Sequence, residues 1–268
     1  MAERLLAVIT GASSGIGAMF ARKLAARSYE LLLIARREDR LRALALELSE
    51  RNHVSAEPLA ADLMLDADLE RVAARIRTAG NLGLLVNNAG FGSAGYFFET
   101  DLAGQMQMHR LHVLATVQLT HAALTNFVAR GTGGVINVAS VAGFWQSPGS
   151  VSYCATKTWM SSFTEGVAME LAARKSPVKM QALCPGFTLS EFHDVAHMDR
   201  RAIPKSLWMT ADFVVSESLR AFDKGTLFVV PGWRYKLIAA LMRTMPRPVM
   251  HWASIAGARS RRLHADRN

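Results

Sequence analysis

Apolar runs alternate along the chain with segments whose apolar residues recur at helical spacing. The short, β-rich runs lie at 5–10, 31–35, 54–61, 83–87, 134–140, 178–184 and 226–231. The helical segments between them lie at 15–28, 38–51, 66–79, 103–130, 151–175 and 210–222. Strands that alternate with helices are typical of βαβ units. We therefore expect a doubly wound α/β fold, with helices on both faces of a parallel sheet.

The pattern changes at about residue 232. No repeat, low-complexity segment or linker divides the chain before that point, so we expect one domain over residues 1–232. The remaining residues, 233–268, contain two amphipathic stretches, 234–245 and 249–263, on either side of a Pro-Arg-Pro sequence. We therefore expect a C-terminal helical extension after the main domain.

The positive charge of the chain is concentrated in this extension. The whole chain carries +9, of which residues 234–268 account for +7 and the first 233 residues for about +2. Because the main domain is nearly neutral, we expect no nucleic-acid partner. A basic amphipathic segment that contains a tryptophan, here Trp252, is typical of peripheral membrane contact. The same helices are also compatible with packing on the main domain or on a second subunit.

Signals for export and for metal binding are missing from the sequence. No apolar run approaches the roughly 18 residues that a membrane-spanning helix needs, and the first thirty residues lack the pattern of a signal peptide. Cys154 and Cys184 form neither a disulfide framework nor a metal-ligand spacing. We therefore expect a cytoplasmic protein without a metal site.

A glycine-rich turn, TGASSGIG at 10–17, follows the first predicted strand and opens the first predicted helix. Glycines in this position allow a tight turn and let a pyrophosphate approach the N-terminus of the helix. The spacing G-x-x-x-G-x-G differs from G-x-G-x-x-G, and a simple helix cap beside flexible glycines is the alternative. The strand–turn–helix context favours dinucleotide binding. The residues expected to bind it are Gly11, Ser13, Ser14, Gly15, Ile16 and Gly17.

The end of the second predicted strand, LIARRE at 33–38, indicates which dinucleotide binds. Ala35 stands where an acidic residue would bind the ribose 2′-hydroxyl of NAD. Arg36 and Arg37 follow, and a guanidinium group suits a 2′-phosphate. We therefore expect NADP(H), with Arg36 as a phosphate ligand. Arg37 either shares this role or begins a solvent-exposed helix.

Six motifs occur in register along the chain. They are TGASSGIG (10–17), ADL (61–63), NNAG (87–90), NVAS (137–140), YCATK (153–157) and PG (185–186). In order and spacing they resemble the compact, single-domain branch of the short-chain dehydrogenase/reductase family, from residue 4 to about 232. The resemblance implies a seven-stranded Rossmann-like sheet in the order 3-2-1-4-5-6-7 and oxidoreductase activity. It also implies homodimers or homotetramers that form through the 103–130 and 151–175 helices.

The resemblance also assigns cofactor contacts by position. It implies that Asp62 contacts the adenine with Leu63 beside it, and that Asn87 packs near the adenosine ribose and supports the central strand. The residues expected to close over the nicotinamide are Pro185, Gly186 and Thr188.

Tyr153 and Lys157 are four residues apart in a predicted helix, so they lie on one face of it. A free tyrosine has a pKa near ~10, and a neighbouring ammonium favours the phenolate. We therefore expect Lys157, helped by an oxidised nicotinamide, to lower the pKa of Tyr153, which acts as general acid/base. Both residues are also expected to contact the cofactor, Lys157 through the ribose hydroxyls. Ser140, at the end of the fifth predicted strand, is expected to hold the substrate oxygen.

One residue departs from the pattern of the family that the chain resembles. His112 stands where that family usually has an asparagine, which bends the helix and orders a water in the proton relay. A histidine can donate or accept through either ring nitrogen, and it also titrates. It either replaces the structural hydrogen bonds of the asparagine or joins the relay as a catalytic group. A third interpretation is that the relay is broken and activity is low.

The segments 91–98, 142–150 and 187–209 are expected to form the substrate wall. Their aromatic residues suggest a pocket for a bulky, largely apolar ketone, 3-oxoacyl or steroid-like substrate. These residues are Phe91, Phe144, Trp145, Phe187 and Phe192, and each is also compatible with a place in the core. The 187–209 segment is long and lacks periodicity. It is therefore expected to be a mobile lid or, without ligand, disordered.

Together these patterns predict an NADPH-dependent short-chain dehydrogenase/reductase that transfers a hydride between the nicotinamide and a carbonyl or alcohol. The alternative hypothesis is an NADP-binding sensor or scaffold with little or no catalytic activity, which uses its basic tail to bind a membrane or a partner. The presence of Ser140, Tyr153 and Lys157 favours the enzyme, whereas His112 leaves room for the alternative.

Overall fold

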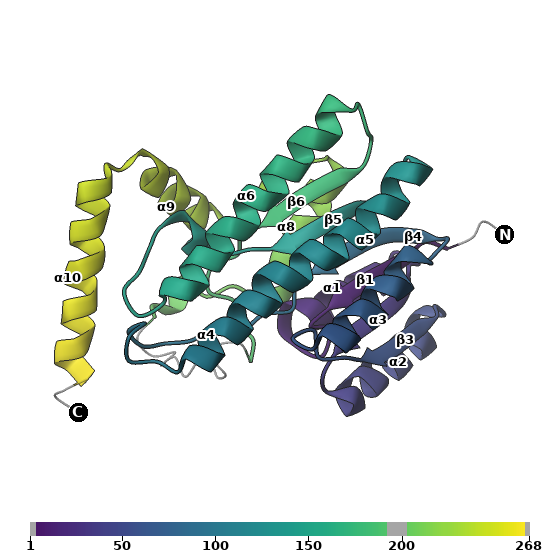
Figure 1. The fold of residues 1–268 in the computed structure, drawn as a ribbon, viewed down its shortest axis with the longest axis horizontal. Coiled ribbons are helices and arrows are strands. Elements are labelled where there is room, and N and C mark those ends of the chain that lie inside the picture. The colour runs from purple at the N-terminus through teal and green to yellow at the C-terminus, as the bar shows by residue number, and fades with distance from the viewer. Residues whose placement is uncertain (1–3, 192–202, 266–268) are drawn as a thin grey trace.

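The computed structural model describes residues 4–191 and 203–265, with side chains up to residue 258 in the last helix. Within these residues, seven parallel strands form one sheet in the order β3-β2-β1-β4-β5-β6-β7, which confirms the predicted topology (Figure 1). The strands are β1 Leu6–Thr10, β2 Glu30–Ala35, β3 Ala56–Ala60, β4 Leu82–Asn87, β5 Gly134–Val138, β6 Lys179–Leu183 and β7 Phe228–Val229.

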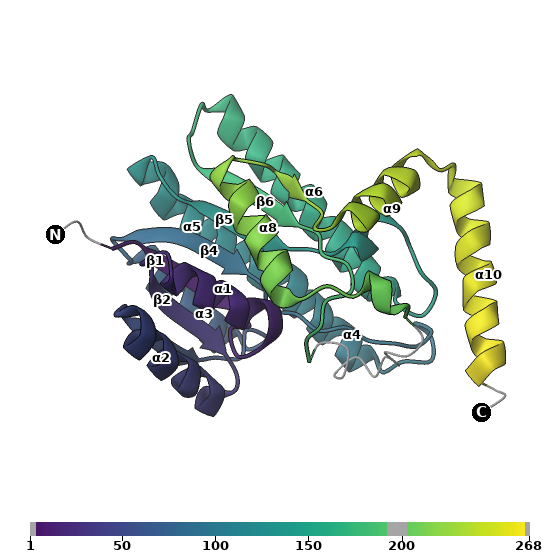
Figure 2. The same ribbon diagram turned by 180° about the vertical axis from the view of Figure 1, so that it is seen from behind.

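Helices cover both faces of the sheet, because its central strands are apolar at nearly every position. Every residue of β1 and β4 is buried, as expected for parallel strands with two covered faces. One core lies against α1 (Gly15–Ala25), α2 (Glu38–Asn52) and α8 (Ala211–Asp223). The other lies against α3 (Asp66–Arg77), α5 (Ala115–Arg130) and α6 (Val151–Ala173), and Figures 1 and 2 show these two layers from opposite sides.

The helix predicted over residues 103–130 is not continuous. It consists of α4 (Leu102–His109), a π-helical turn at Arg110–Leu114, and α5. A π-turn inserts an extra residue into the helix and is frequent at functional sites. Here it contains His112, whose side chain is completely buried.

Two predicted strands are shorter than their apolar runs. The fifth strand ends at Val138, so Ser140 lies beyond it in extended backbone and begins a short 3₁₀ helix, Val141–Phe144. The seventh strand is only Phe228–Val229, because it pairs at the sheet edge with just two residues of β6. The loop that follows β5 is therefore longer than the sequence pattern indicated.

The extension forms two helices, α9 (Trp233–Thr244) and α10 (Arg247–Ala265). Helix α9 packs on the main domain through Tyr235 and Ala239, which are both buried. Helix α10 stands beside the body at the end opposite the N-terminus, and Ser254 Oγ donates a hydrogen bond of 3.1 Å to the Gln146 carbonyl (Figures 1 and 2). None of the described helices is long and apolar enough to span a bilayer.

Candidate active site

A cavity of about 540 Å³ runs along the carboxyl ends of the strands. We call one end of the cavity the glycine-turn end. It contains Ser13, Ser14, Arg37, Arg40 and Glu191, and all of these except Arg40 line the cavity. At the other, the tyrosine end, lie Ser140, Tyr153 and Lys157. Ligands of open α/β sheets bind at this edge, so the topology brings the predicted binding and chemical groups together.

The glycine turn has the backbone that the motif requires. Gly11 and Gly15 have φ angles of +66° and +54°, which residues with side chains rarely adopt. A Cβ atom on Gly17 would lie 2.2 Å from the Gly11 carbonyl oxygen, so α1 and β1 could not pack as closely with any other residue there. Gly17 is thus a packing residue and does not line the cavity, whereas Gly11, Ser13, Ser14, Gly15 and Ile16 do.

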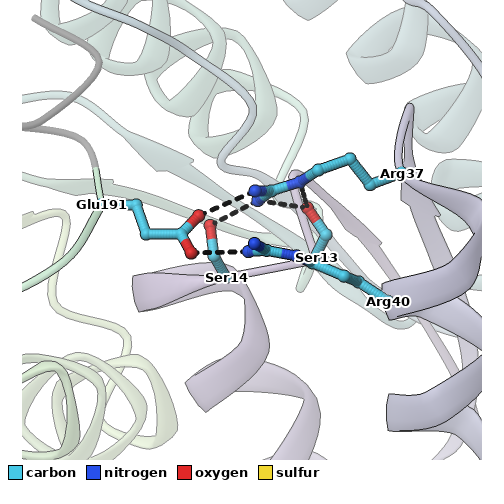
Figure 3. Close-up of polar contacts among 5 residues, drawn as sticks. All are labelled: Ser13, Ser14, Arg37, Arg40 and Glu191. Carbon is cyan, nitrogen blue, oxygen red and sulfur yellow. Dashed lines mark hydrogen bonds and ion pairs between the residues drawn. The ribbon is translucent and has the colours of Figure 1, made fainter.

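The two arginines after β2 differ in their contacts. Arg36 is exposed and lines the cavity, and it forms no ion pair with another described residue. Arg37 crosses to the glycine turn: its Nη2 donates to Ser13 Oγ at 3.0 Å and to Ser14 Oγ at 3.1 Å (Figure 3). Its Nη1 donates to the Glu191 carboxylate at 2.8 Å. Arg37, for which the sequence left two roles open, therefore points to the glycine-turn end, while 41% of its side chain stays exposed.

Asp62 and Leu63, which the resemblance assigns to the adenine, both line the cavity. Asp62 Oδ1 accepts a hydrogen bond from the Met64 amide at 3.0 Å, which fixes the turn after β3. Asn87 does not line the cavity. Its Nδ2 donates to Thr120 Oγ1 at 3.0 Å and to Asn137 Oδ1 at 2.9 Å, so it joins β4 to α5 and β5 inside the core.

At the tyrosine end, Ser140 and Tyr153 share a hydrogen bond, in which the serine lowers the pKa of the phenol. Desolvation has the larger effect and raises the pKa of Tyr153 to about 12. This is opposite to the direction expected from the sequence, because Lys157 Nζ donates to the Val138 carbonyl at 2.7 Å and lies 5.8 Å from the centre of the Tyr153 ring. The protein groups alone therefore keep Tyr153 protonated at neutral pH.

Lys157 is a buried cation, with only 5% of its surface exposed. Burial lowers its pKa to about 8, since the charged form loses its hydration. The lysine is therefore still largely charged at pH 7, and its hydrogen bond to the Val138 carbonyl holds the ammonium group at the end of β5.

His112 lies behind the cavity wall and does not line it. The Phe91 amide donates to its Nε2 at 3.1 Å, so that nitrogen is an acceptor and the other, Nδ1, carries the proton. Nδ1 lies 3.0 Å from Thr156 Oγ1, which in turn donates to the Tyr153 carbonyl. Burial, with the charges of Lys157 and His109, holds the pKa of His112 well below 6.5. Both ring nitrogens are thus engaged, and the neutral ring joins the loop after β4 to α6.

The segment after β6 contains Pro185, Gly186 and Thr188, which all line the cavity. Its conformation depends on Tyr235 of α9, whose hydroxyl donates to the Leu207 carbonyl at 2.7 Å and accepts from the Phe187 amide at 3.0 Å. A Cβ on Gly186 would lie 2.0 Å from the Tyr235 ring, so this glycine is required for the contact. No sequence signal pointed to Tyr235, because it lies in the tail, outside every motif.

The predicted substrate wall is present in part. Phe91, Trp145 and Phe187 line the cavity. Phe144 does not, because its ring packs under the Arg243 guanidinium of α9 at 5.0 Å. Phe192 and the rest of residues 192–202 in the predicted lid lie outside the described residues. The two ends of the 187–209 segment are joined by a parallel bridge between Thr188 and Met209.

Comparisons with known proteins agree with this arrangement. The chain matches the family model described as short chain dehydrogenase over residues 5–200. Sulfoacetaldehyde reductase 2 of Chromohalobacter salexigens is 35% identical over 195 residues, which cover 70% of this chain and 74% of that protein.

Two solved structures are similar over most of the chain. A short-chain dehydrogenase from Sphingobium yanoikuyae in complex with NADPH has a TM-score of 0.82 at 34% identity, covering 91% of this chain and 97% of that one. The bulky-bulky ketone specific alcohol dehydrogenase of Comamonas testosteroni has a TM-score of 0.78 at 30% identity, covering 91% and 95%. With its family model, sheet order and site motifs, this chain belongs to the short-chain dehydrogenase/reductase family of oxidoreductases.

Proposed function

We propose that the protein is an NADP(H)-dependent oxidoreductase that interconverts a carbonyl and an alcohol on a bulky, largely apolar substrate. The observation that carries this proposal is that Ser140, Tyr153 and Lys157 line the same cavity as the glycine turn. The glycine conformations and the N-terminus of α1 fit a dinucleotide pyrophosphate. When bound, the nicotinamide supplies or accepts the hydride and, in its oxidised form, adds a positive charge to the site.

The protein supplies the proton and stabilises the developing charge on the oxygen. In the reductive direction the Tyr153 hydroxyl donates its proton to the carbonyl oxygen of the substrate, and a pKa of about 12 keeps that proton in place at neutral pH. The Ser140 hydroxyl donates a hydrogen bond to the same oxygen. The Lys157 ammonium then stabilises the phenolate that remains.

NADP(H) is the proposed cofactor because the glycine-turn end offers guanidinium groups and has Ala35 in place of an acidic residue. Arg37 has the stronger support, since it already reaches Ser13 and Ser14, with Arg36 as a second ligand. Titration of the protein with NADPH and NADH, followed by ligand fluorescence, tests this part. Equal affinity for the two cofactors would contradict it.

The substrate class is proposed from the aromatic lining of the tyrosine end, where Phe91, Trp145 and Phe187 lie. The relative from Comamonas, named for bulky-bulky ketones, has the same fold and supports this choice. The test is NADPH oxidation with a panel of aliphatic, aryl, 3-oxoacyl and steroid ketones. Turnover confined to small polar aldehydes would contradict the substrate class. NADPH binding without turnover of any carbonyl would favour the sensor or scaffold hypothesis.

His112 is proposed as a positioning residue and not as a member of the proton relay. Its two hydrogen bonds, to the Phe91 amide and to Thr156, link two walls of the active site. A relay through the ring would have to break one of them.

The division into a catalytic domain, 1–232, and a helical extension, 233–268, is kept as a proposal. Among the described residues of the extension, only α9 packs on the main domain through buried residues, which is compatible with this division. Peripheral membrane contact through residues 234–268 stays a prediction, supported by the exposed side chains Val249, Trp252 and Ile255 on α10. Co-sedimentation with anionic vesicles, with and without residues 247–268, tests it. Cytoplasmic localisation likewise stays a prediction.

A homodimer or homotetramer is proposed on the exposed apolar side chains of the helices expected at the interface. They include Leu102, Met106 and Leu114 along α4 and the π-turn, and Val151 and Met169 on α6. Light scattering after size-exclusion chromatography tests this proposal, and a monomer at micromolar concentration would contradict it.

A further inference from the structure

We propose that Glu191 competes with the 2′-phosphate of NADP(H) for the guanidinium groups of Arg37 and Arg40, and so weakens the preference of the protein for NADP(H) over NAD(H). This inference rests on the proposed function, because it assumes that the glycine-turn end binds the 2′-phosphate. Glu191 would then be a further determinant of cofactor selectivity, although it lies far from the dinucleotide motif in the sequence.

The contacts at the glycine-turn end support a direct competition. One Glu191 oxygen accepts from Arg37 Nη1 at 2.8 Å, and the other accepts from Arg40 Nη1 (Figure 3). The same Arg37 side chain holds Ser13 and Ser14 of the glycine turn. The carboxylate therefore occupies a donor of the residue that the proposed function assigns to a phosphate, and carboxylate and phosphate both accept charge-assisted hydrogen bonds from guanidinium groups.

The backbone beside Glu191 also lies on the glycine turn. A Cβ atom on Gly15 would approach Ser190 Cβ to 2.9 Å, so residues 190–191 are packed directly against the first residue of α1. Ser190 and Glu191 both line the cavity. Residues 187–191 therefore run from the tyrosine end to the glycine-turn end, where the ion pairs of Glu191 hold them. Binding of the 2′-phosphate would break these ion pairs.

The charges of the two anions determine whether Glu191 or the 2′-phosphate binds the arginines. The two guanidinium groups carry two positive charges, and Glu191 neutralises one of them. The two arginines hold the pKa of Glu191 below its usual range, so the carboxylate is ionised at neutral pH. A phosphate monoester carries about −1.5 to −2 and displaces a single carboxylate. The 2′-hydroxyl of NAD(H) has no charge with which to do so, and Glu191 stays in place when that cofactor binds.

The exposed setting limits the size of the effect. The side chains of Arg37, Arg40 and Glu191 are 41%, 45% and 42% exposed, and such ion pairs are weakened by solvent and salt. We expect Glu191→Gln to lower the Kd for NADPH roughly three- to tenfold and to leave the Kd for NADH within about twofold.

Binding of NADPH, NADH, 2′-AMP and 5′-AMP to the full chain, measured by calorimetry at fixed salt, tests the proposal. Glu191→Gln should tighten NADPH and 2′-AMP alone. Glu38→Gln is the matched control, because it removes one acidic charge from the start of α2, pairs with Arg42 and does not line the cavity. The control should leave all four constants unchanged.

The outcomes separate this inference from the proposed function. If Arg37→Ala weakens NADPH but Glu191→Gln leaves NADPH unchanged or weakens it, Glu191 only positions Arg37 and the inference is overturned. If Glu38→Gln tightens NADPH as much as Glu191→Gln, the effect is general electrostatics and the inference is also overturned. If wild type binds NADH as tightly as NADPH and Arg37→Ala changes neither, the proposed NADP(H) site itself is wrong.

Discussion

The two ends of the cavity hold their charges in different ways. At the tyrosine end Lys157 is buried and donates to a backbone carbonyl, whereas at the glycine-turn end Arg37 and Glu191 form an exposed ion pair. A buried charge has a strongly shifted pKa and a large effect on stability. An exposed pair contributes about 0–1 kcal/mol and is screened by salt. We therefore expect the tyrosine end to control chemistry and stability, and the glycine-turn end to control which cofactor binds.

The largest effect is expected for Tyr153→Phe. Removing the proposed proton donor should lower kcat for carbonyl reduction about 10³-fold, within the usual contribution of general acid catalysis. Steady-state NADPH oxidation with an active ketone measures it. Tyr29→Phe is the control, since it makes the same chemical change away from the cavity. If Tyr153→Phe keeps more than a tenth of the activity, the tyrosine end does not control the chemistry.

The next largest effect is expected on the free energy of unfolding, because the buried charge of Lys157 destabilises the folded state. Its folded pKa of about 8 lies below the unfolded value of 10.5, so the unfolded state binds more protons between these pH values. The unfolding free energy of wild type should therefore rise relative to Lys157→Met as pH increases from 8 to 10.5, by up to about 3 kcal/mol. Urea unfolding of both proteins at several pH values measures this difference.

Comparison with the variant is needed because other groups titrate in this range. The thiol of Cys184 has a folded pKa raised to about 11, so it removes stability from both proteins above about pH 9. The difference between the two curves removes most of that contribution, because burial and not the charge of Lys157 is the largest cause of the raised thiol pKa. Parallel curves from pH 8 to 10.5 would mean that Lys157 is not held as a costly buried cation.

Arg37→Ala tests whether the glycine-turn end controls the choice of cofactor. Loss of a charge-assisted contact to the 2′-phosphate should raise the Kd for NADPH about 10- to 100-fold and leave that for NADH nearly unchanged. Arg42→Ala is the matched control, because Arg42 also lies on α2 but pairs with Glu38 outside the cavity. Equal losses for both cofactors would show that Arg37 supports the fold of the turn and does not select the cofactor.

The smallest effect is expected for His112→Asn. The neutral ring makes two hydrogen bonds, and an asparagine can also donate and accept, so kcat should stay within about threefold of wild type. Because the pKa of His112 lies well below 6.5, the pH profiles of the two proteins should have the same shape between pH 6 and 8. A hundredfold loss, or a changed profile, would place His112 in the proton relay.

Motifs with a backbone requirement were the most predictable part of the site. Gly11 and Gly15 need left-handed φ angles, and the sequence shows where only glycine meets that need. Tyr153 and Lys157 were predictable because a helix fixes their spacing. The pKa of Tyr153 was not, since it depends on desolvation and on the hydrogen bond with Ser140, which the segment after β5 supplies.

Contacts between distant segments were hidden from the sequence. Tyr235 supports Gly186 from 49 residues away, and Glu191 meets Arg37 across 154 residues. Glu191 belongs to no periodic pattern or local motif, and the amphipathic stretch that contains Tyr235 does not show what this side chain contacts. The hydrogen bonds of Asn87 were hidden for a similar reason, because its buried partners come from β5 and α5. Its predicted place near the ribose stays a prediction.

The sequence by itself determined the alternation of strands and helices, the glycine turn, the position of the Tyr153 and Lys157 pair, and the separate basic tail. These features depend on local periodicity, backbone freedom and composition, which a single chain displays directly. Only the tertiary structure decided that Arg37 turns toward Ser13, that His112 has both nitrogens engaged, and that Glu191 lies against the arginines. Each of these depends on which side chains the parallel sheet brings to one edge, and on the burial that follows from it.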